Sequence, residues 1–155
     1  MKYKIAFLIG SESDRTIVES SVPYFKHFKL DFDILVMSAH RNPNKVSDFA
    51  ASARNNGYSL IVCGAGMAAH LGGAIKAHTT LPVIGVPLPG GMMDGLDSLL
   101  STVQMPKGVP VATMSVGKSG AINAAIFCAE VLSLNDEELV TKLDEFKKNG
   151  AKISD

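Results

Sequence analysis

The sequence has no tryptophan, only three tyrosines and only two cysteines, Cys63 and Cys128. Two isolated thiols without a CxxC spacing do not suggest a disulfide framework or a zinc cluster. No apolar stretch approaches the roughly 18 residues of a membrane helix. The apolar run at residues 5–10 is also too short for a signal peptide, and acidic residues follow it at once. We therefore expect a soluble cytoplasmic protein with no membrane partner.

Charge is also scarce. Charged residues make up 19% of the chain, against roughly 25% in an average globular protein, and 15 basic residues balance 15 acidic ones. No basic run is longer than Lys147-Lys148, so nucleic acid is not an expected partner. An anionic ligand would have to be small. The low charge has two open explanations, a well-buried α/β core or apolar surface covered by neighbouring subunits.

What the chain does contain is an alternation of strand and helix patterns. Apolar runs predict strands at residues 5–9, 32–37, 60–63, 82–86 and 109–116. Helical patterns lie between them, at residues 14–30 with a kink at Pro23, 42–56 with Asn42 as N-cap, 68–78, 94–104 and 121–132. A charged amphipathic helix opened by Asn135 follows, to about residue 149.

This alternation defines βαβ units and hence a parallel sheet. The predicted fold is α/β, a three-layer doubly wound parallel sheet of flavodoxin-like order. We expect a single domain over residues 1–155, with a helical tail from about 135.

In an open parallel sheet, ligands bind beyond the carboxyl ends of the strands, where the strand order reverses. The loops after the first three predicted strands, residues 10–14, 38–43 and 64–70, hold most of the suggestive polar residues. These loops should therefore converge on the ligand site.

The first loop offers Ser11, Ser13 and Asp14 just before a helix. Hydroxyls and free helical N–H groups favour phosphate, whereas the Asp14 carboxylate suits ribose hydroxyls better. The alternative is that Ser13 or Asp14 only caps the helix. The phosphate-binding pattern GxxxxGK[ST] is absent from this loop.

The second loop combines Ser38, His40 and Arg41 at a strand-to-helix junction. Arginine binds phosphate through two parallel hydrogen bonds, and histidine exchanges protons near neutral pH. A purely structural role for this pair stays open.

The third loop is rich in glycine and alanine around Gly66 and ends at His70. Such a loop allows the backbone to approach a flat ligand closely, or else packs a small-residue helix against the sheet or another subunit. His70 is either a second ligand contact or a hydrogen-bonded structural histidine. His27 and His78 lie on predicted helices, and we expect them to be structural or exposed.

Together these loops resemble the N5-carboxyaminoimidazole ribonucleotide mutases of bacterial purine synthesis. The resemblance runs in order from about residue 4 to 132. Its motifs are residues 10–14 (GSESD), 38–41 (SAHR) with Pro43, 64–71 (GAGMAAHL), 81–87 (LPVIGVP), 95–101 (GLDSLLS), 103–106 (VQMP), 108–113 (GVPVAT) and 123–125 (NAA). Each motif is weak alone, but their ordered combination is specific.

The resemblance implies a flavodoxin-like subunit of a homo-octamer, with active sites where subunits meet. It assigns catalysis to His40 and substrate contacts to Ser11, Asp14 and Arg41. Ser13, Ser38 and the backbone from Gly66 to His70 would close the pocket. It implies a small ribonucleotide substrate and no metal or other cofactor. The implied reaction moves a carboxyl group from an exocyclic amine to ring carbon 4 through transient carbon dioxide.

Four positions depart from the family pattern, which usually has Gly at Met67, Thr at Asn42, Pro at Gly72 and Met at Ala74. We expect Met67 to narrow the loop over the base.

Three other functions compete with the mutase. The nearest is a carboxylase that adds free carbon dioxide to aminoimidazole ribonucleotide, although its pocket loops differ from those seen here. A flavin-binding module would lack stacking partners, because no tyrosine or tryptophan lies in the three loops. A phosphoacceptor receiver domain would need an aspartate where the third strand ends in Cys63-Gly64.

Overall fold

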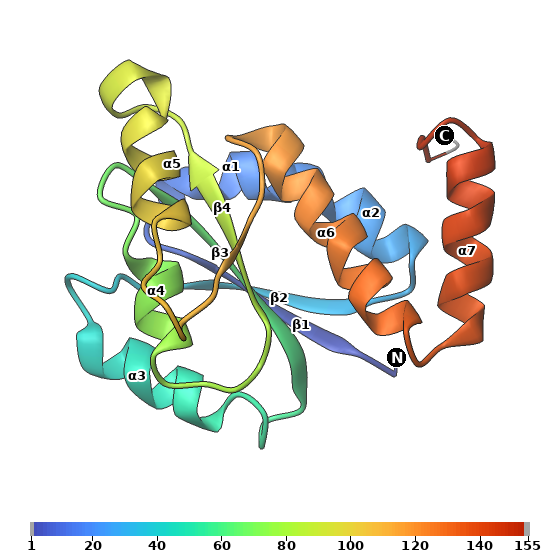
Figure 1. The fold of residues 1–155 in the computed structure, drawn as a ribbon, viewed down its shortest axis with the longest axis horizontal. Coiled ribbons are helices and arrows are strands. Elements are labelled where there is room, and N and C mark those ends of the chain that lie inside the picture. The colour runs from blue at the N-terminus through green and yellow to red at the C-terminus, as the bar shows by residue number, and fades with distance from the viewer. Residues whose placement is uncertain (1, 154–155) are drawn as a thin grey trace.

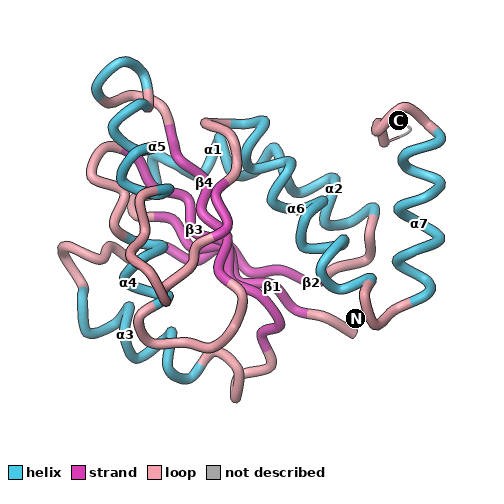
Figure 2. The backbone as a smooth tube through the Cα atoms, in the orientation of Figure 1, coloured by secondary structure: helices cyan, strands magenta, loops and turns pink. Residues whose placement is uncertain are grey.

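The computed structural model describes residues 2–153 and contains a five-stranded parallel sheet. The sheet has the order β2-β1-β3-β4-β5, the flavodoxin-like order predicted from the sequence (Figure 1). Its strands are β1 (Lys4–Ile9), β2 (Asp31–Val36), β3 (Tyr58–Gly66), β4 (Val83–Leu88) and β5 (Ala112–Thr113). The strands run through the middle of the molecule with helices on both sides (Figure 2).

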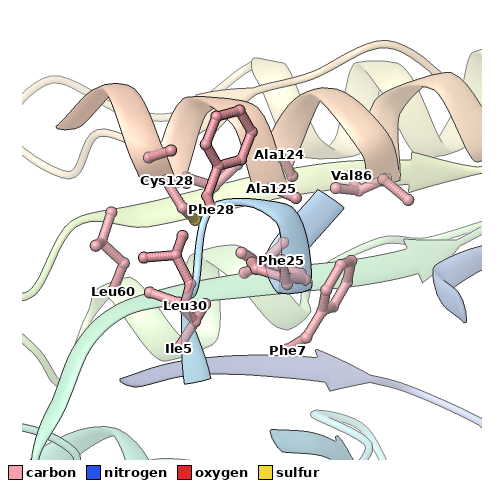
Figure 3. Close-up of a cluster of buried hydrophobic side chains, with 14 of the residues drawn as sticks. Ile5, Phe7, Phe25, Phe28, Leu30, Leu60, Val86, Ala124, Ala125 and Cys128 are labelled. Carbon is pink, nitrogen blue, oxygen red and sulfur yellow. The ribbon is translucent and has the colours of Figure 1, made fainter. Parts of the chain in front are cut away.

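The two sheet faces carry separate apolar clusters. Along β1, Ile5 and Phe7 face one cluster, whereas Ala6 and Leu8 face the other, as the two-residue repeat of a strand requires. The first cluster packs under α1, α2, α6 and α7, and the Phe7 and Phe25 rings meet edge to face within it (Figure 3). The second cluster packs under α3 and α4 (Figure 1).

The first crossover is broken into short helical turns. It consists of the 3-10 helix η1 (Glu12–Asp14), α1 (Arg15–Val18), the 3-10 helix η2 (Glu19–Ser21) and α2 (Val22–His27). The regular helix restarts at Val22, and Pro23 lies in its first turn, where a missing N–H costs no hydrogen bond. The kink predicted at Pro23 is confirmed as this break.

The remaining helices are α3 (Pro43–Ser52), α4 (Leu71–Lys76), η3 (Met92–Asp94), α5 (Leu96–Val103), α6 (Lys118–Ser133) and α7 (Glu137–Lys148). The expectation that Asn135 opens the last helix is wrong. Asp136 is the N-cap, because its carboxylate accepts hydrogen bonds from Glu138 N (3.0 Å) and Leu139 N (3.4 Å). Asn42 does occupy the N-cap of α3, but its side chain makes no capping hydrogen bond.

Two predicted boundaries near the site are corrected. β5 covers two residues rather than 109–116, because the approach contains Gly108 at φ 92° and Pro110, which has no N–H to donate. β3 extends beyond Cys63 to Gly66, which pairs in register with Leu88 of β4. The third loop therefore consists of residues 67–70, and α4 begins at Leu71 instead of about 68.

Both cysteines are buried, Cys63 in the second cluster and Cys128 in the first. Burial raises the pKa of both thiols, so neither serves as a ready nucleophile. Among residues 2–153, no helix is long and apolar enough to cross a membrane.

Candidate functional site

A cavity of about 320 Å³ lies beyond the carboxyl ends of β1, β2 and β3, where the three predicted loops meet. All eight residues that the sequence singled out line it. They are Ser11, Ser13, Asp14, Ser38, His40, Arg41, Gly66 and His70. The volume falls at the lower end of the range of small-molecule sites.

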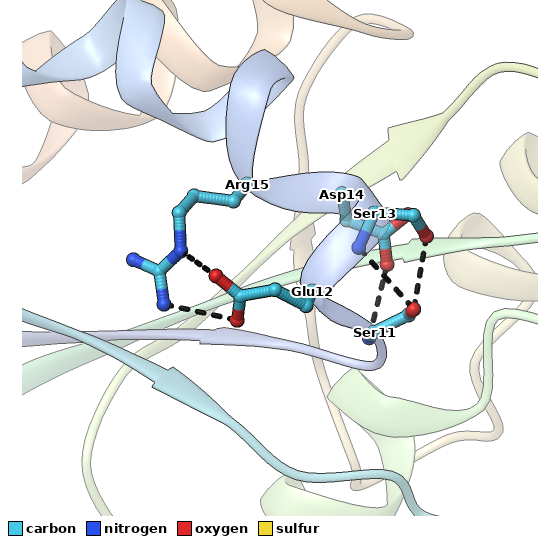
Figure 4. Close-up of polar contacts among 5 residues, drawn as sticks. All are labelled: Ser11, Glu12, Ser13, Asp14 and Arg15. Carbon is cyan, nitrogen blue, oxygen red and sulfur yellow. Dashed lines mark hydrogen bonds and ion pairs between the residues drawn. The ribbon is translucent and has the colours of Figure 1, made fainter.

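The first loop is a capping box that also forms one wall of the cavity. Ser11 Oγ accepts hydrogen bonds from Ser13 N (3.3 Å) and Ser13 Oγ (2.9 Å), and the Asp14 carboxylate accepts one from Ser11 N (3.2 Å; Figure 4). The cap is Ser11 rather than Ser13 or Asp14, with Asp14 completing the capping box from the third position of the turn, and Asp14 makes no capping hydrogen bond at the start of α1. Capping does not remove these side chains from the cavity. Burial raises the pKa of the Asp14 carboxyl, although the Ser11 N–H opposes the shift.

Within the same turn, Glu12 forms an exposed ion pair with Arg15 (Figure 4). Glu12 does not line the cavity, whereas Ser11, Ser13 and Asp14 do. Arg15, the first residue of α1, is therefore already paired with the Glu12 carboxylate.

The second loop is a tight turn that places Arg41 on the cavity wall. Ser38 Oγ accepts a hydrogen bond from Arg41 N (3.3 Å), and Ser38 O accepts one from Asn42 N (2.8 Å). No carboxylate in the described part of the chain forms an ion pair with Arg41. Its guanidinium is available to an anionic ligand.

The second and third loops are joined by their histidines. His40 Nε2 and His70 Nδ1 are 2.7 Å apart, and the two rings meet edge to face with centroids 4.9 Å apart. His70 is thus hydrogen-bonded, as one of its two sequence interpretations required, and its partner is the histidine singled out for proton transfer.

The third loop is held in an unusual backbone conformation at Met67. This residue has φ 53°, a left-handed conformation that residues other than glycine rarely adopt, and it is 65% exposed at the cavity. Ser101 of α5 donates a hydrogen bond to Met67 O (3.4 Å). The family usually has Gly at position 67, and the backbone conformation there itself favours glycine.

Sequence reasoning missed the loop after β4, whose residues Pro89 and Gly90 also line the cavity. Their signal was available, since a Pro-Gly-Gly turn follows the fourth predicted strand and must end on the same edge of the sheet. Within residues 2–153, no group of three or more His, Cys, Asp and Glu side chains is placed to hold a metal ion.

Apolar side chains are exposed beside the cavity. Met92 and Met93 follow the Pro89-Gly90 wall by two residues, and α5 exposes Leu96, Leu100 and Val103 along one helical face. We call these five residues the α5 patch. Only Asp97 and Lys107 are charged between residues 95 and 117.

The fold and the cavity define a flavodoxin-like α/β protein with a cavity of small-molecule size at the switch point of its sheet. Residues 4–152 match the family model described as AIR carboxylase, and the chain belongs to this family.

Its relatives include the N5-carboxyaminoimidazole ribonucleotide mutases of Escherichia coli K12 and Bacillus subtilis 168. The first is 44% identical over 145 residues, covering 94% of this chain and 86% of the relative. The second is 46% identical over 149 residues, covering 96% and 92%. The crystal structure of Treponema denticola PurE superposes with a TM-score of 0.86 at 25% identity, covering 96% of this chain and 91% of that chain.

Proposed function

We propose that this protein is an isomerase that converts N5-carboxyaminoimidazole ribonucleotide to 4-carboxy-5-aminoimidazole ribonucleotide in de novo purine (IMP) biosynthesis. The observation that carries the proposal is the His40 imidazole in a cavity that also presents Arg41 and Asp14. The near full-length similarity to mutases supports it.

The chemistry needs one proton to be given and one to be taken back. The carbamate N–C bond breaks, carbon dioxide leaves, and the amine nitrogen accepts a proton from the imidazolium of His40. Ring carbon 4 then attacks the carbon dioxide, and its own proton returns to the imidazole as the ring regains aromaticity. The reaction is neutral in protons overall, which suits a single acid–base residue.

The remaining cavity residues would bind and position the ribonucleotide. Arg41 forms no ion pair within residues 2–153 and would bind the phosphate. Asp14 lines the same cavity and would accept from ribose hydroxyls. Ser11, Ser13 and Ser38 supply further hydroxyls, and the backbone from Gly66 to His70 would pack against the base. Because most residues there carry small side chains, the backbone could approach the base closely, and such close packing would hold carbon dioxide near carbon 4 until recapture.

The same proposal includes a cytoplasmic homo-octamer of single-domain subunits, with sites completed by neighbouring chains. His40, Arg41 and His70 are all exposed in the isolated chain, and the helix that carries part of the α5 patch contacts the third loop through Ser101 and Met67 O. Covering this patch with a second copy would remove exposed apolar surface and close the cavity to water.

Light scattering tests the assembly. The expected mass is about eight times 16.4 kDa, and Leu100→Asp should lower both mass and activity. Lys107→Asp, a charge reversal outside the α5 patch, is the control. A fully active monomer would contradict the octamer and the shared site, while leaving His40 as a candidate catalyst.

The substrate assay tests the reaction itself. Purified protein should convert N5-carboxyaminoimidazole ribonucleotide at a rate that does not depend on added bicarbonate. It should be inactive with aminoimidazole ribonucleotide and bicarbonate at comparable concentrations. The opposite preference would identify the carboxylase alternative.

A further inference from the structure

The contact between His40 and His70 restricts how many protons the two rings can hold. At 2.7 Å, His40 Nε2 and His70 Nδ1 must share a single hydrogen, with one nitrogen donating and the other accepting. When both rings are neutral, either ring can donate the shared hydrogen to the other. When the pair carries one extra proton, the charged ring donates to the neutral ring. Two imidazolium rings would place two N–H groups against each other, so the contact cannot survive a second protonation.

Few other charges face the two rings. Asp14 and Arg41 are the other charged side chains that line this cavity in the described part of the chain, and neither makes a hydrogen bond with a histidine ring. His70 lies at the N-terminal end of α4, and its backbone carbonyl accepts from Ala74 N (2.9 Å), which fixes the residue in place. The partner that orients the His40 ring is therefore His70.

We propose that His40 and His70 work as one unit that holds a single exchangeable proton, with His70 as a positioning residue. His70 accepts from His40 Nε2–H when His40 is charged, and a hydrogen bond from a charged donor is stronger than one from a neutral donor. At 2.7 Å the pair therefore accommodates one exchangeable proton and opposes a second.

The catalytic role of this histidine pair depends on the proposed function. The isomerisation begins with a proton leaving the unit for the amine nitrogen as the N–C bond breaks. It ends with the carbon 4 proton returning to the unit after the new C–C bond has formed. Between these steps the pair is neutral and still hydrogen-bonded, so the His40 ring keeps its orientation while carbon dioxide is recaptured.

Two substitutions of His70 separate orientation from proton holding. His70→Phe keeps a ring but removes the acceptor, and His70→Asn keeps a polar atom near the position of Nδ1 without a titrating group. We expect kcat to fall about 10- to 100-fold in the Phe variant, as for partners that orient a functional histidine, with partial recovery in the Asn variant. KM should change by less than about twofold, since the substrate contacts remain.

The pH profile distinguishes this role from a structural one. In His70→Phe, the pH profile of kcat should change, because His40 Nε2–H loses its acceptor and the proton is no longer shared between two rings. His78→Asn, at an exposed histidine outside the cavity, is the control and should leave kcat and its pH profile unchanged. A Phe variant with unchanged kcat and an unchanged profile would overturn the proposal.

Histidine-selective NMR of the intact free protein tests the pair without substrate. The His40 and His70 resonances should move together through one transition that accounts for one proton, and His40 should titrate alone in His70→Phe. Two complete, independent protonations in the wild type would overturn the pair even if mutase activity is present. A coupled transition in a protein without mutase activity would instead reject the proposed function and keep the pair.

Discussion

Gly85 of β4 lies directly under α5, and alanine at this position would push the helix away from the sheet. A Cβ atom built on Gly85 would be 2.3 Å from Thr102 Cγ2 and 3.1 Å from Val111 Cγ1. Carbon atoms make favourable contact at about 3.5–4.0 Å, so Thr102 would have to move by more than about 1 Å. It cannot simply rotate, because its hydroxyl donates to Ser98 O at 2.7 Å and its branched Cβ limits its rotamers.

We expect Gly85→Ala to destabilise the protein by about 1–3 kcal/mol, the usual cost of adding a methyl group to a packed core. For a chain of this length the loss corresponds to a Tm lower by about 2–12 °C, measured by calorimetry at one fixed subunit concentration. KM should also rise, since displacement of α5 breaks the contact from Ser101 to Met67 O at the cavity.

Thr102→Ser supplies the matched rescue, because it removes Cγ2 and keeps the hydroxyl. Alone it should cost about 0.8 kcal/mol for the lost methyl group, but combined with Gly85→Ala it should restore part of the stability. Gly73→Ala is the control, since its nearest neighbours are the flexible end of Met105 at 3.4 Å. If the stability losses of Gly85→Ala and Thr102→Ser simply add in the double variant, the inferred clash with Thr102 is refuted.

Three further predictions concern the cavity. His40→Asn should preserve the fold, because the turn is held by Ser38, whose Oγ accepts from Arg41 N and whose carbonyl accepts from Asn42 N, while lowering kcat about 10²- to 10⁴-fold; more than a tenth of wild-type turnover would reject its proton-transfer role. Arg41→Ala should raise KM for the phosphorylated substrate with little change in kcat, and an unchanged KM would mean that the phosphate binds elsewhere. Asp14→Asn should weaken ribose binding yet stabilise the protein at neutral pH. Burial raises the pKa of Asp14 in the folded state, so the native protein binds more protons and loses stability as pH rises through that range. The Tm advantage of the Asn variant should therefore grow as pH rises above the ordinary aspartate pKa of about 3.9, and a shrinking advantage would contradict the burial effect.

The fold could be predicted because its signals are local and repeated. Apolar runs such as residues 5–9 are buried on both faces of β1, and the alternation of strands and helices selected the observed sheet order. Boundaries depended on contacts that the sequence does not display. The extension of β3 to Gly66 follows from pairing with β4, and the choice of Asp136 over Asn135 follows from side-chain geometry.

The cavity could be placed because strand ends in a parallel sheet converge, which brought together eight residues from the ends of three strands and the segments that follow them. The contact between His40 and His70 was not predictable, because the residues are 30 positions apart and the contact depends on how two loops fold. The same rule applies to Pro89 and Gly90 after β4, but residues 89–91 carry no polar side chain that would indicate a ligand contact.

The central claim is that the carboxyl group travels from nitrogen to carbon 4 without leaving the enzyme. Substrate carrying ¹³C in its carbamate should be turned over in unlabelled bicarbonate, and the product carboxyl analysed by NMR or mass spectrometry. Retention of the label in nearly all of the product is the predicted result, because confinement makes recapture faster than escape. A product whose carboxyl matches the unlabelled bicarbonate pool would contradict the account and identify a carboxylase that uses free carbon dioxide.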